Sequence, residues 1–153
     1  MESLERLLAE HPFFSDLAPE YQALLTGCAR AARFEGGEFI FREGEPANAF
    51  YVVRRGRIAI TTLTPHEGAV TIKTVDEGQI VGWSWLLPPY TWRFAARALE
   101  PTVVIALDAE CVRRKSEEDH ELGYQIMRRF AQVMASRLEA THMQLLNVYE
   151  HRR

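Results

Sequence analysis

The residues best suited to chemistry lie between Gly82 and Ala98, a segment that holds all three tryptophans of the protein. A glycine at the start of a short helical turn exposes backbone N–H groups that bind anions such as phosphate. An arginine such as Arg93 can pair with the same anion through charge-assisted hydrogen bonds. The indoles can stack on a base or a nicotinamide ring, or they can fill the core or pack on the terminal helix. The segment therefore contains residue types that a site for a phosphorylated ligand uses.

Short strands are predicted from residue 33 to residue 107, where glycines mostly recur every eight to twelve residues. Evenly spaced strands with turn glycines favour a β-sandwich or a small barrel. Gly44 and Gly56 fall where tight turns need a positive φ. The runs rich in β-branched and aromatic residues are 39–41, 50–53, 58–61, 70–72 and 102–105.

Helices are predicted on both sides of this β zone. Residues 4–32 show apolar residues at helical spacing, with Pro19 in the first turn of a second helix. After the β zone, Asp108 is expected to cap a short helix through Lys115, and residues 116–119 resemble the cap of a longer helix.

The last helix is expected to run from about Glu117 to Glu150, roughly 50 Å at about 1.5 Å per residue. One face carries Leu122, Ile126, Phe130, Val133, Leu138, Leu145 and Val148, and a second face carries Met127, Met134, Met143 and Leu146. This length exceeds what a small barrel can cover. The second face therefore predicts a homodimer through this helix, with a frayed solvent helix as the alternative.

Composition narrows the class of protein. The 153 residues suit one domain, and the net charge of −3 leaves no electrostatic footprint for nucleic acid. No signal peptide or membrane span is evident, which makes the cytoplasm the expected location. Cys28 and Cys111 are interpreted as two small hydrophobes, without a disulfide framework or metal cluster. The basic run 113–115 is interpreted as a solvated helix face.

Residues 34–58 resemble the opening half of a cyclic nucleotide-binding domain, of the kind found as the effector domain of Crp/Fnr-type regulators. The similarity lies in a glycine-hinged strand, a Glu-Gly-Glu-Pro turn at 43–46, an aromatic-Tyr-Val-Val strand and a Gly-x-Ile hairpin at 56–58. It implies one mainly β domain over 1–153. N-terminal helices would occupy 1–32, a β jelly-roll barrel 33–107, and C-terminal helices 108–150. It also implies that the last helix dimerises and closes over the ligand.

The same resemblance implies a phosphate-binding cassette at residues 82–98. In the family, a glycine opens the cassette, a glutamate accepts a hydrogen bond from the ribose, and an arginine pairs with the phosphate. Gly82 matches the glycine, and Trp83 stands in the glutamate position. Without gaps Trp92 falls on the arginine position, whereas a cassette one residue longer restores Arg93. Arg97 is the other candidate for the phosphate.

The predicted function is that of a non-enzymatic cytoplasmic regulatory or ligand-sensing domain, a dimer with altered nucleotide specificity or none. His66 is the sole histidine of the β zone, so metal catalysis is not expected. Direct reading of DNA is not expected either, because the 153 residues include no helix-turn-helix after the long helix. Candidate ligands are cyclic AMP and cyclic GMP. The alternative is an accessory subunit of a larger redox enzyme of the NAD-linked hydrogenase type, binding a nicotinamide nucleotide. The predicted ligand-binding residues are Gly82, Trp83, Ser84, Trp85, Trp92 and Arg93, with Ser84 either donating to phosphate or capping the turn.

Overall fold

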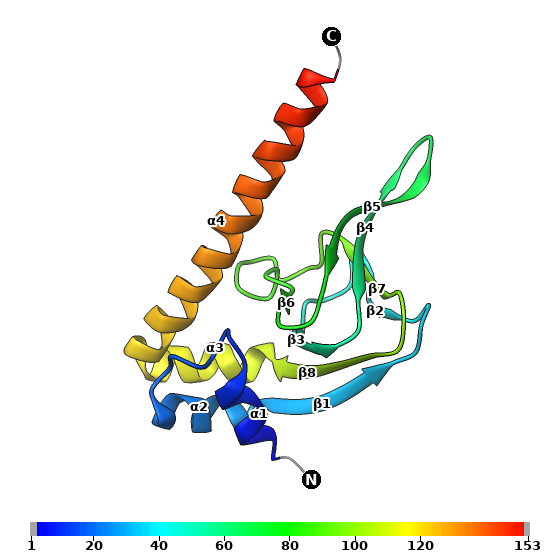
Figure 1. Ribbon diagram of the computed structural model, residues 1–153. Helices are drawn as coiled ribbons and strands as arrows, with labels where there is room; N and C mark the ends of the chain where they lie inside the picture. Colours follow the sequence, from blue (N-terminus) through cyan, green and yellow to red (C-terminus); the bar gives the residue numbers. More distant parts are fainter. Residues whose placement is uncertain (1–2, 152–153) are drawn as a thin grey trace. The chain divides into compact units, whose positions relative to one another are not determined.

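The computed structural model describes residues 3–151 (Figure 1). The chain divides into two compact units, residues 1–115 and 116–153. The helices are α1 (Leu4–Glu10), α2 (Pro19–Thr26), α3 (Ala109–Glu118) and α4 (His120–Glu150). The strands are β1 (Ala29–Phe34), β2 (Phe39–Phe41), β3 (Ala49–Arg55), β4 (Ile58–Thr64), β5 (Gly68–Val75), β6 (Ile80–Val81), β7 (Ala95–Ala98) and β8 (Thr102–Asp108).

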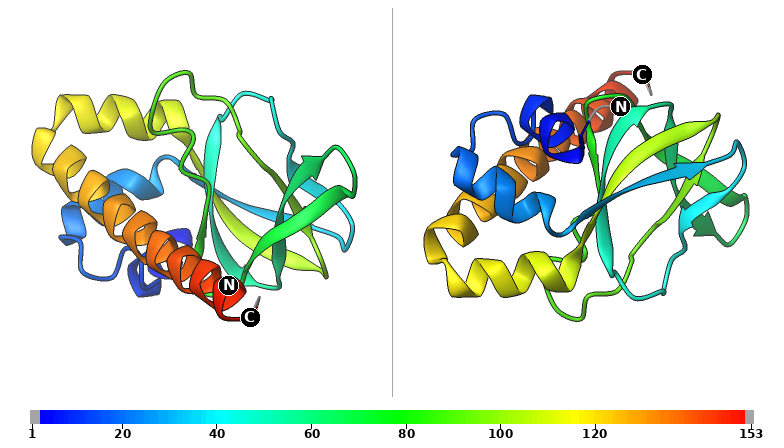
Figure 2. Two further views of the ribbon diagram at one scale, coloured as in Figure 1. Left: turned by 90° about the horizontal axis from the view of Figure 1, so that it is seen from above. Right: turned by 90° about the horizontal axis from the view of Figure 1, so that it is seen from below.

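The strands form two four-stranded antiparallel sheets, in the orders β1-β8-β3-β6 and β2-β7-β4-β5. Non-consecutive strands are neighbours in both sheets, as a jelly roll requires. The predicted mainly β jelly roll with flanking helices and a long C-terminal helix is therefore confirmed. The two views of Figure 2 show α1, α2 and the start of α3 at the same end of the strands.

The core of the first unit lies on both faces of the first sheet, because four successive residues of β3, 50–53, are all at most 9% exposed. Val52 and Ile105, which are register partners in β3 and β8, are fully buried. Phe50 of β3 is also fully buried and lies 6.5 Å from the ring of Phe13, in the segment between α1 and α2. Burying these apolar groups is the main favourable contribution to folding.

Strand β1 begins at Ala29, inside the stretch that the sequence pattern assigns to helices. Alanine and arginine favour helix over strand, and residues 29–33 contain nothing else. All six residues nevertheless pair with β8, so tertiary pairing overrides the local preference. Strands β6 and β7 were also missed, because β6 has two residues and β7 is built of alanine and arginine.

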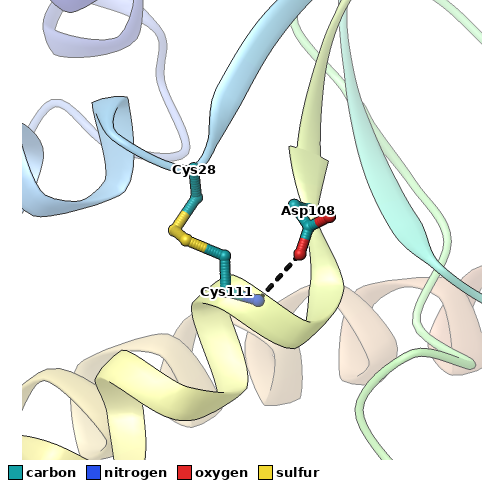
Figure 3. Close-up of a disulfide and its surroundings, with 3 residues drawn as sticks. All are labelled: Cys28, Asp108 and Cys111. Carbon is teal, nitrogen blue, oxygen red and sulfur yellow. Dashed lines mark hydrogen bonds between the residues drawn. A yellow bond between two sulfur atoms is a disulfide. The ribbon is translucent and has the colours of Figure 1, made fainter.

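The interpretation of the two cysteines as separate hydrophobes is wrong. Cys28 and Cys111 form a disulfide with an S–S distance of 2.07 Å and a Cα–Cα distance of 5.7 Å (Figure 3). They are 83 residues apart in sequence, but β1 follows Cys28 directly and pairs with β8, which leads directly into α3. Sequence distance therefore says nothing about their distance in the fold.

Helix α3 begins where the sequence predicts, because the Asp108 carboxylate accepts a hydrogen bond from the Cys111 N–H at 2.8 Å (Figure 3). Helix α4 begins later than expected. Its N-cap is Asp119, which accepts from the N–H groups of Glu121 and Leu122, whereas Ser116 lies inside α3.

The predicted apolar face of α4 divides into two parts. Leu122, Ile126 and Phe130 are at most 1% exposed, whereas Leu138 and Leu145 are more than half exposed. The second predicted face is largely exposed as well, as at Met127 and Met143. Within residues 3–151, no helix has the length and apolar character needed to cross a membrane.

Candidate functional site

Gly82 opens the cassette directly after β6 and has a φ of 96°, a conformation that favours glycine. A Cβ atom placed on Gly82 would lie 2.6 Å from Cη2 and 2.9 Å from Cζ3 of Trp92. The six-membered ring of Trp92 therefore covers Gly82 and occupies the space next to its Cα.

Trp92 is held in this position from several sides. Its indole is 5% exposed and stacks on Phe41 of β2, with ring centroids 3.6 Å apart and planes 7° apart. Its backbone N–H donates to the Glu45 carbonyl at 2.9 Å, and its carbonyl accepts from the Gly44 N–H at 2.8 Å. Phe41 in turn stacks on Tyr51, with centroids 6.2 Å apart. Trp92, Phe41 and Tyr51 thus form a row of rings, called the aromatic column below.

Trp85 is a second buried anchor of the cassette. It is 1% exposed and stacks on Phe50 at a centroid distance of 4.7 Å. Its carbonyl accepts a hydrogen bond from Nη1 of Arg113 at 2.6 Å. The Arg113 guanidinium also lies over the Tyr90 ring, 4.3 Å from its centroid. Arg113 of α3 therefore contacts the cassette at two points, the Trp85 carbonyl and the Tyr90 ring.

The sequence pattern does not indicate the contacts of Arg113 with Trp85 and Tyr90, because the basic run 113–115 favours a solvated helix face. Three consecutive cations on a helix point in different directions, so their spacing cannot single one out. Arg113 is half-buried, whereas the neighbouring Arg114 is exposed. Helical phase shows this difference only once the position of the cassette relative to α3 is known.

Trp83 and Ser84 lie in a single turn closed by the Leu86 N–H, which donates to the Trp83 carbonyl at 3.1 Å. The Trp83 side chain is half-buried, and Ser84 is 8% exposed. Trp83 stands where the family pattern has an acid, and an indole cannot accept a hydrogen bond from a sugar hydroxyl, because its ring N–H is a donor only.

The two candidate arginines differ in what they contact. Arg97 donates from Nε to the Gly37 carbonyl at 2.9 Å, and its guanidinium lies 5.5 Å from the Phe39 centroid. Arg93 is exposed, and within residues 3–151 its side chain has no hydrogen bond or ion pair. Arg97 is therefore engaged with Gly37 and Phe39, whereas the Arg93 side chain has no partner among the described residues.

A second feature is a cavity of about 480 Å³ at the end of the first sheet. Its walls include both half-cystines together with Arg30, Asn48, Tyr51 and Asp108. Burial raises the pKa of Tyr51, an effect opposed by the charge of Arg30 and reinforced by that of Glu45. No sequence pattern indicates this cavity, because its walls come from three distant stretches of chain, 27–30, 48–51 and 106–111.

Comparison with known proteins agrees with this architecture. Residues 31–119, more than half of the chain, match the family model of the cyclic nucleotide-binding domain. A cyclic nucleotide-binding protein of Geobacter metallireducens has a similar crystal structure, at 28% identity and a TM-score of 0.79, covering 90% of this chain and 99% of that one. A cyclic nucleotide-binding domain of Methylobacillus flagellatus gives the same TM-score at 18% identity, covering 94% of this chain and 81% of that one.

Among curated proteins, the chain is 22% identical over 145 residues to the CRP-like cAMP-activated global transcriptional regulator of Mycobacterium tuberculosis. That match covers 95% of this chain and 63% of the regulator. The chain therefore spans less than two thirds of this relative. The resemblance inferred from the motifs at residues 34–58 is confirmed, and the chain belongs to the cyclic nucleotide-binding domain family.

Proposed function

We propose that this chain is a non-enzymatic regulatory domain whose phosphate cassette is filled by its own Trp92, so that cyclic AMP and cyclic GMP do not bind it in the usual way. The observation that carries the proposal is the packing of the Trp92 ring over Gly82. The relatives are named as regulators, channels and kinases that respond to cyclic nucleotides, which supports a regulatory role for this domain.

The physical argument rests on what a nucleotide would have to displace. We infer that a phosphate bound at the N–H groups after Gly82 would need the space beside the Gly82 Cα, which the indole occupies. Removing a buried tryptophan from its packing costs about 3 kcal/mol, which would weaken binding by about 150-fold. Trp83 adds to this loss, because the hydrogen-bond acceptor for a ribose hydroxyl is missing.

Calorimetric titration with cyclic AMP and cyclic GMP tests the proposal. We expect no saturable binding to the unmodified chain up to millimolar nucleotide. The double variant Trp83→Glu/Trp92→Ser restores the acid and empties the space over Gly82, so it should bind with an affinity at least tenfold higher. The added variant Arg93→Ala should abolish that gain, because Arg93 is the arginine left to pair with phosphate.

Leu87→Ala is the matched control, because Leu87 lies in the same loop with its side chain half exposed. It should bind no better than the unmodified chain. Micromolar binding of either cyclic nucleotide to the unmodified chain, lost in Arg93→Ala, would contradict the proposal. NADPH serves as a comparison ligand, since none of the relatives cited above is named for a nicotinamide nucleotide.

We further propose that the domain is a homodimer through α4. Its exposed apolar residues include a stripe in which successive members are three, four or seven residues apart, the spacing of a coiled-coil seam. The stripe consists of Met127, Met134, Leu138, Leu145 and Val148. Four of these five side chains are about half exposed, at 48% to 56%. Met143 and Leu146, which the sequence pattern placed on the dimer face, lie outside this stripe, and at about 100° per residue Met143 falls on the opposite side of the helix.

Sedimentation equilibrium tests the dimer. The unmodified chain should have twice the mass of one chain at micromolar concentration. Leu138→Asp/Leu145→Asp should reduce it to one chain, because each introduces a charge into the seam. Ser136→Asp/Asn147→Asp adds the same charge outside the seam and should leave the dimer intact. A monomer at high concentration would overturn this proposal. Cytoplasmic location and an accessory role in a larger enzyme stay predictions.

A further inference from the structure

The Cys28–Cys111 disulfide borders an open cavity instead of lying sealed in the core. Both half-cystines belong to the walls of the 480 Å³ cavity. Cys28 is 7% exposed, whereas Cys111 is half-buried. A small molecule inside the cavity can therefore contact the disulfide, and Cys111 is the more accessible of the two.

Two cations, Arg30 and Lys115, offer positions at which an anionic group of an occupant can bind, opposed by the carboxylates of Asp108 in the wall and Glu45 near Tyr51. Arg30 lines it, is exposed, and has no ion-pair partner within residues 3–151. Lys115 is a second cation at the rim, since its Nζ lies 3.4 Å from a Cβ placed on Gly27, another wall residue. The carboxylate in the wall, that of Asp108, already accepts the Cys111 N–H.

The remaining polar groups of the wall can orient such an occupant. Asn48 contributes an amide, which can both donate and accept hydrogen bonds. Tyr51 contributes a hydroxyl whose pKa is raised by burial, so it remains a neutral donor at neutral pH. The cavity therefore combines cations, hydrogen-bonding groups and a disulfide in one place.

We propose that Cys28–Cys111 is a redox-exchange site at which a carboxylate-bearing low-molecular-weight thiol, of the glutathione type, docks in this cavity and reduces the disulfide. The thiolate attacks Sγ of Cys111, a mixed disulfide forms, and Cys28 leaves as a thiolate that takes a proton from water. A second thiol then attacks the mixed disulfide and releases Cys111. Two electrons pass to the protein, and two thiols are oxidised to one disulfide.

Helix α3 connects the disulfide to the cassette, because it carries both Cys111 and Arg113. Cys111 and Arg113 are two residues apart, so they lie about 200° apart around the helix. Cys111 is tied to the start of β1, while Arg113 holds the Trp85 carbonyl and the Tyr90 ring. Reduction removes one of these two anchors. The aromatic column gives a second connection, because it ends at Tyr51 in the cavity wall and at Trp92 over Gly82.

The effect of the disulfide on the cassette extends the proposed regulatory role and rests on it. The exchange reaction itself does not depend on that role. The regulated event would be a loosening of the cassette when the disulfide is reduced. Failure of the nucleotide titrations would leave the exchange reaction intact, and failure of the exchange experiments would leave the filled cassette intact.

The first experiment measures the rate of reduction of the native chain by alkylation and mass spectrometry. Millimolar reduced glutathione should reduce the disulfide while circular dichroism shows a folded domain. Arg30→Ala should slow reduction by glutathione about tenfold but leave the rate with 2-mercaptoethanol unchanged, because that thiol carries no carboxylate. Equal rates for the variant and the unmodified chain with glutathione would overturn the docking role of the cavity.

The second experiment measures amide hydrogen exchange in residues 83–92 of the reduced and oxidised chain. Reduction should accelerate exchange in this segment about fivefold, and Cys28→Ser/Cys111→Ser should reproduce the effect without reductant. Reduction that unfolds the whole domain, or reduction achieved only after denaturation, would make the disulfide a structural link and overturn the proposal. Unchanged exchange in the cassette of the reduced, folded chain would overturn the coupling through α3.

Discussion

The β3–β4 turn at Gly56 and the cassette at Gly82 use glycine for different reasons. Both glycines have a positive φ, 101° and 96°, and neither has room for a Cβ atom. At Gly56 the crowding includes the Thr102 Cα at 2.7 Å and the Pro101 carbonyl oxygen at 2.8 Å, which are backbone atoms. At Gly82 it comes from the ring of Trp92 alone.

The glycine at position 56 is required by the backbone of the fold, whereas the glycine at position 82 is required by one side chain of this sequence, Trp92. Backbone atoms stay in place whatever the local side chains are, so the requirement at Gly56 belongs to the jelly roll itself. A ring can be exchanged by mutation, so the crowding at Gly82 depends on Trp92. Substitutions in the first region should therefore change stability, and those in the second should change what the cassette can hold.

The largest effect is expected for Gly56→Ala. The new methyl group meets fixed backbone at a φ that alanine rarely adopts, so the free energy of unfolding should fall by about 4 kcal/mol. Gly78→Ala is the control, because Gly78 has a φ of 85° but nothing within 4 Å of a Cβ. It should cost about 1 kcal/mol from backbone strain alone. Urea denaturation measures both, and equal losses would show that φ, not backbone crowding, dominates the turn.

A second effect on the scaffold comes from His11, which is 8% exposed and whose Nδ1 accepts the Phe13 N–H. Burial lowers its pKa from 6.5 to about 4, opposed by the polar backbone of Val53. Between these values the unfolded chain binds a proton that the folded chain does not. Stability should therefore fall as the pH drops from about 6.5 to about 4, by about 2 to 3 kcal/mol.

Denaturation curves at several pH values measure this slope, and His11→Gln should remove most of it while leaving the folded structure in place. A slope that persists unchanged in His11→Gln would assign the pH dependence to other groups. The cassette contains no histidine, so this titration acts on the scaffold and should leave nucleotide binding untouched.

The sequence was most informative where local chemistry and fold agree. Aromatic and β-branched residues identified β2, β3 and β4, and the turn glycines 44 and 56 have the positive φ expected of them. It was least informative where distant segments meet. Nothing local to Ala29–Phe34 signals a strand, because its partner β8 lies at the other end of the β zone.

The same reason explains the errors around the candidate site. Whether a tryptophan packs or binds depends on what lies opposite it, and the partner of Trp92 is Phe41, some fifty positions earlier in the chain. The disulfide and the contact of Arg113 with Trp85 likewise join segments whose proximity follows from sheet pairing. Residue types and the family resemblance pointed to residues 82–98, but only the fold shows that the Trp92 ring packs against Gly82.

The smallest effect is expected for a substitution of Arg113, which tests whether contacts from α3 hold the cassette in place. Arg113→Met removes the hydrogen bond to the Trp85 carbonyl and the contact with Tyr90, which should cost about 1 kcal/mol of global stability. Hydrogen exchange in residues 83–90 should accelerate about fivefold, because this loss falls on the cassette. Arg114→Met removes an exposed neighbour and should change neither quantity. If both variants leave exchange unchanged, the buried tryptophans alone fix the cassette, which would then be as much a part of the scaffold as the turn at Gly56.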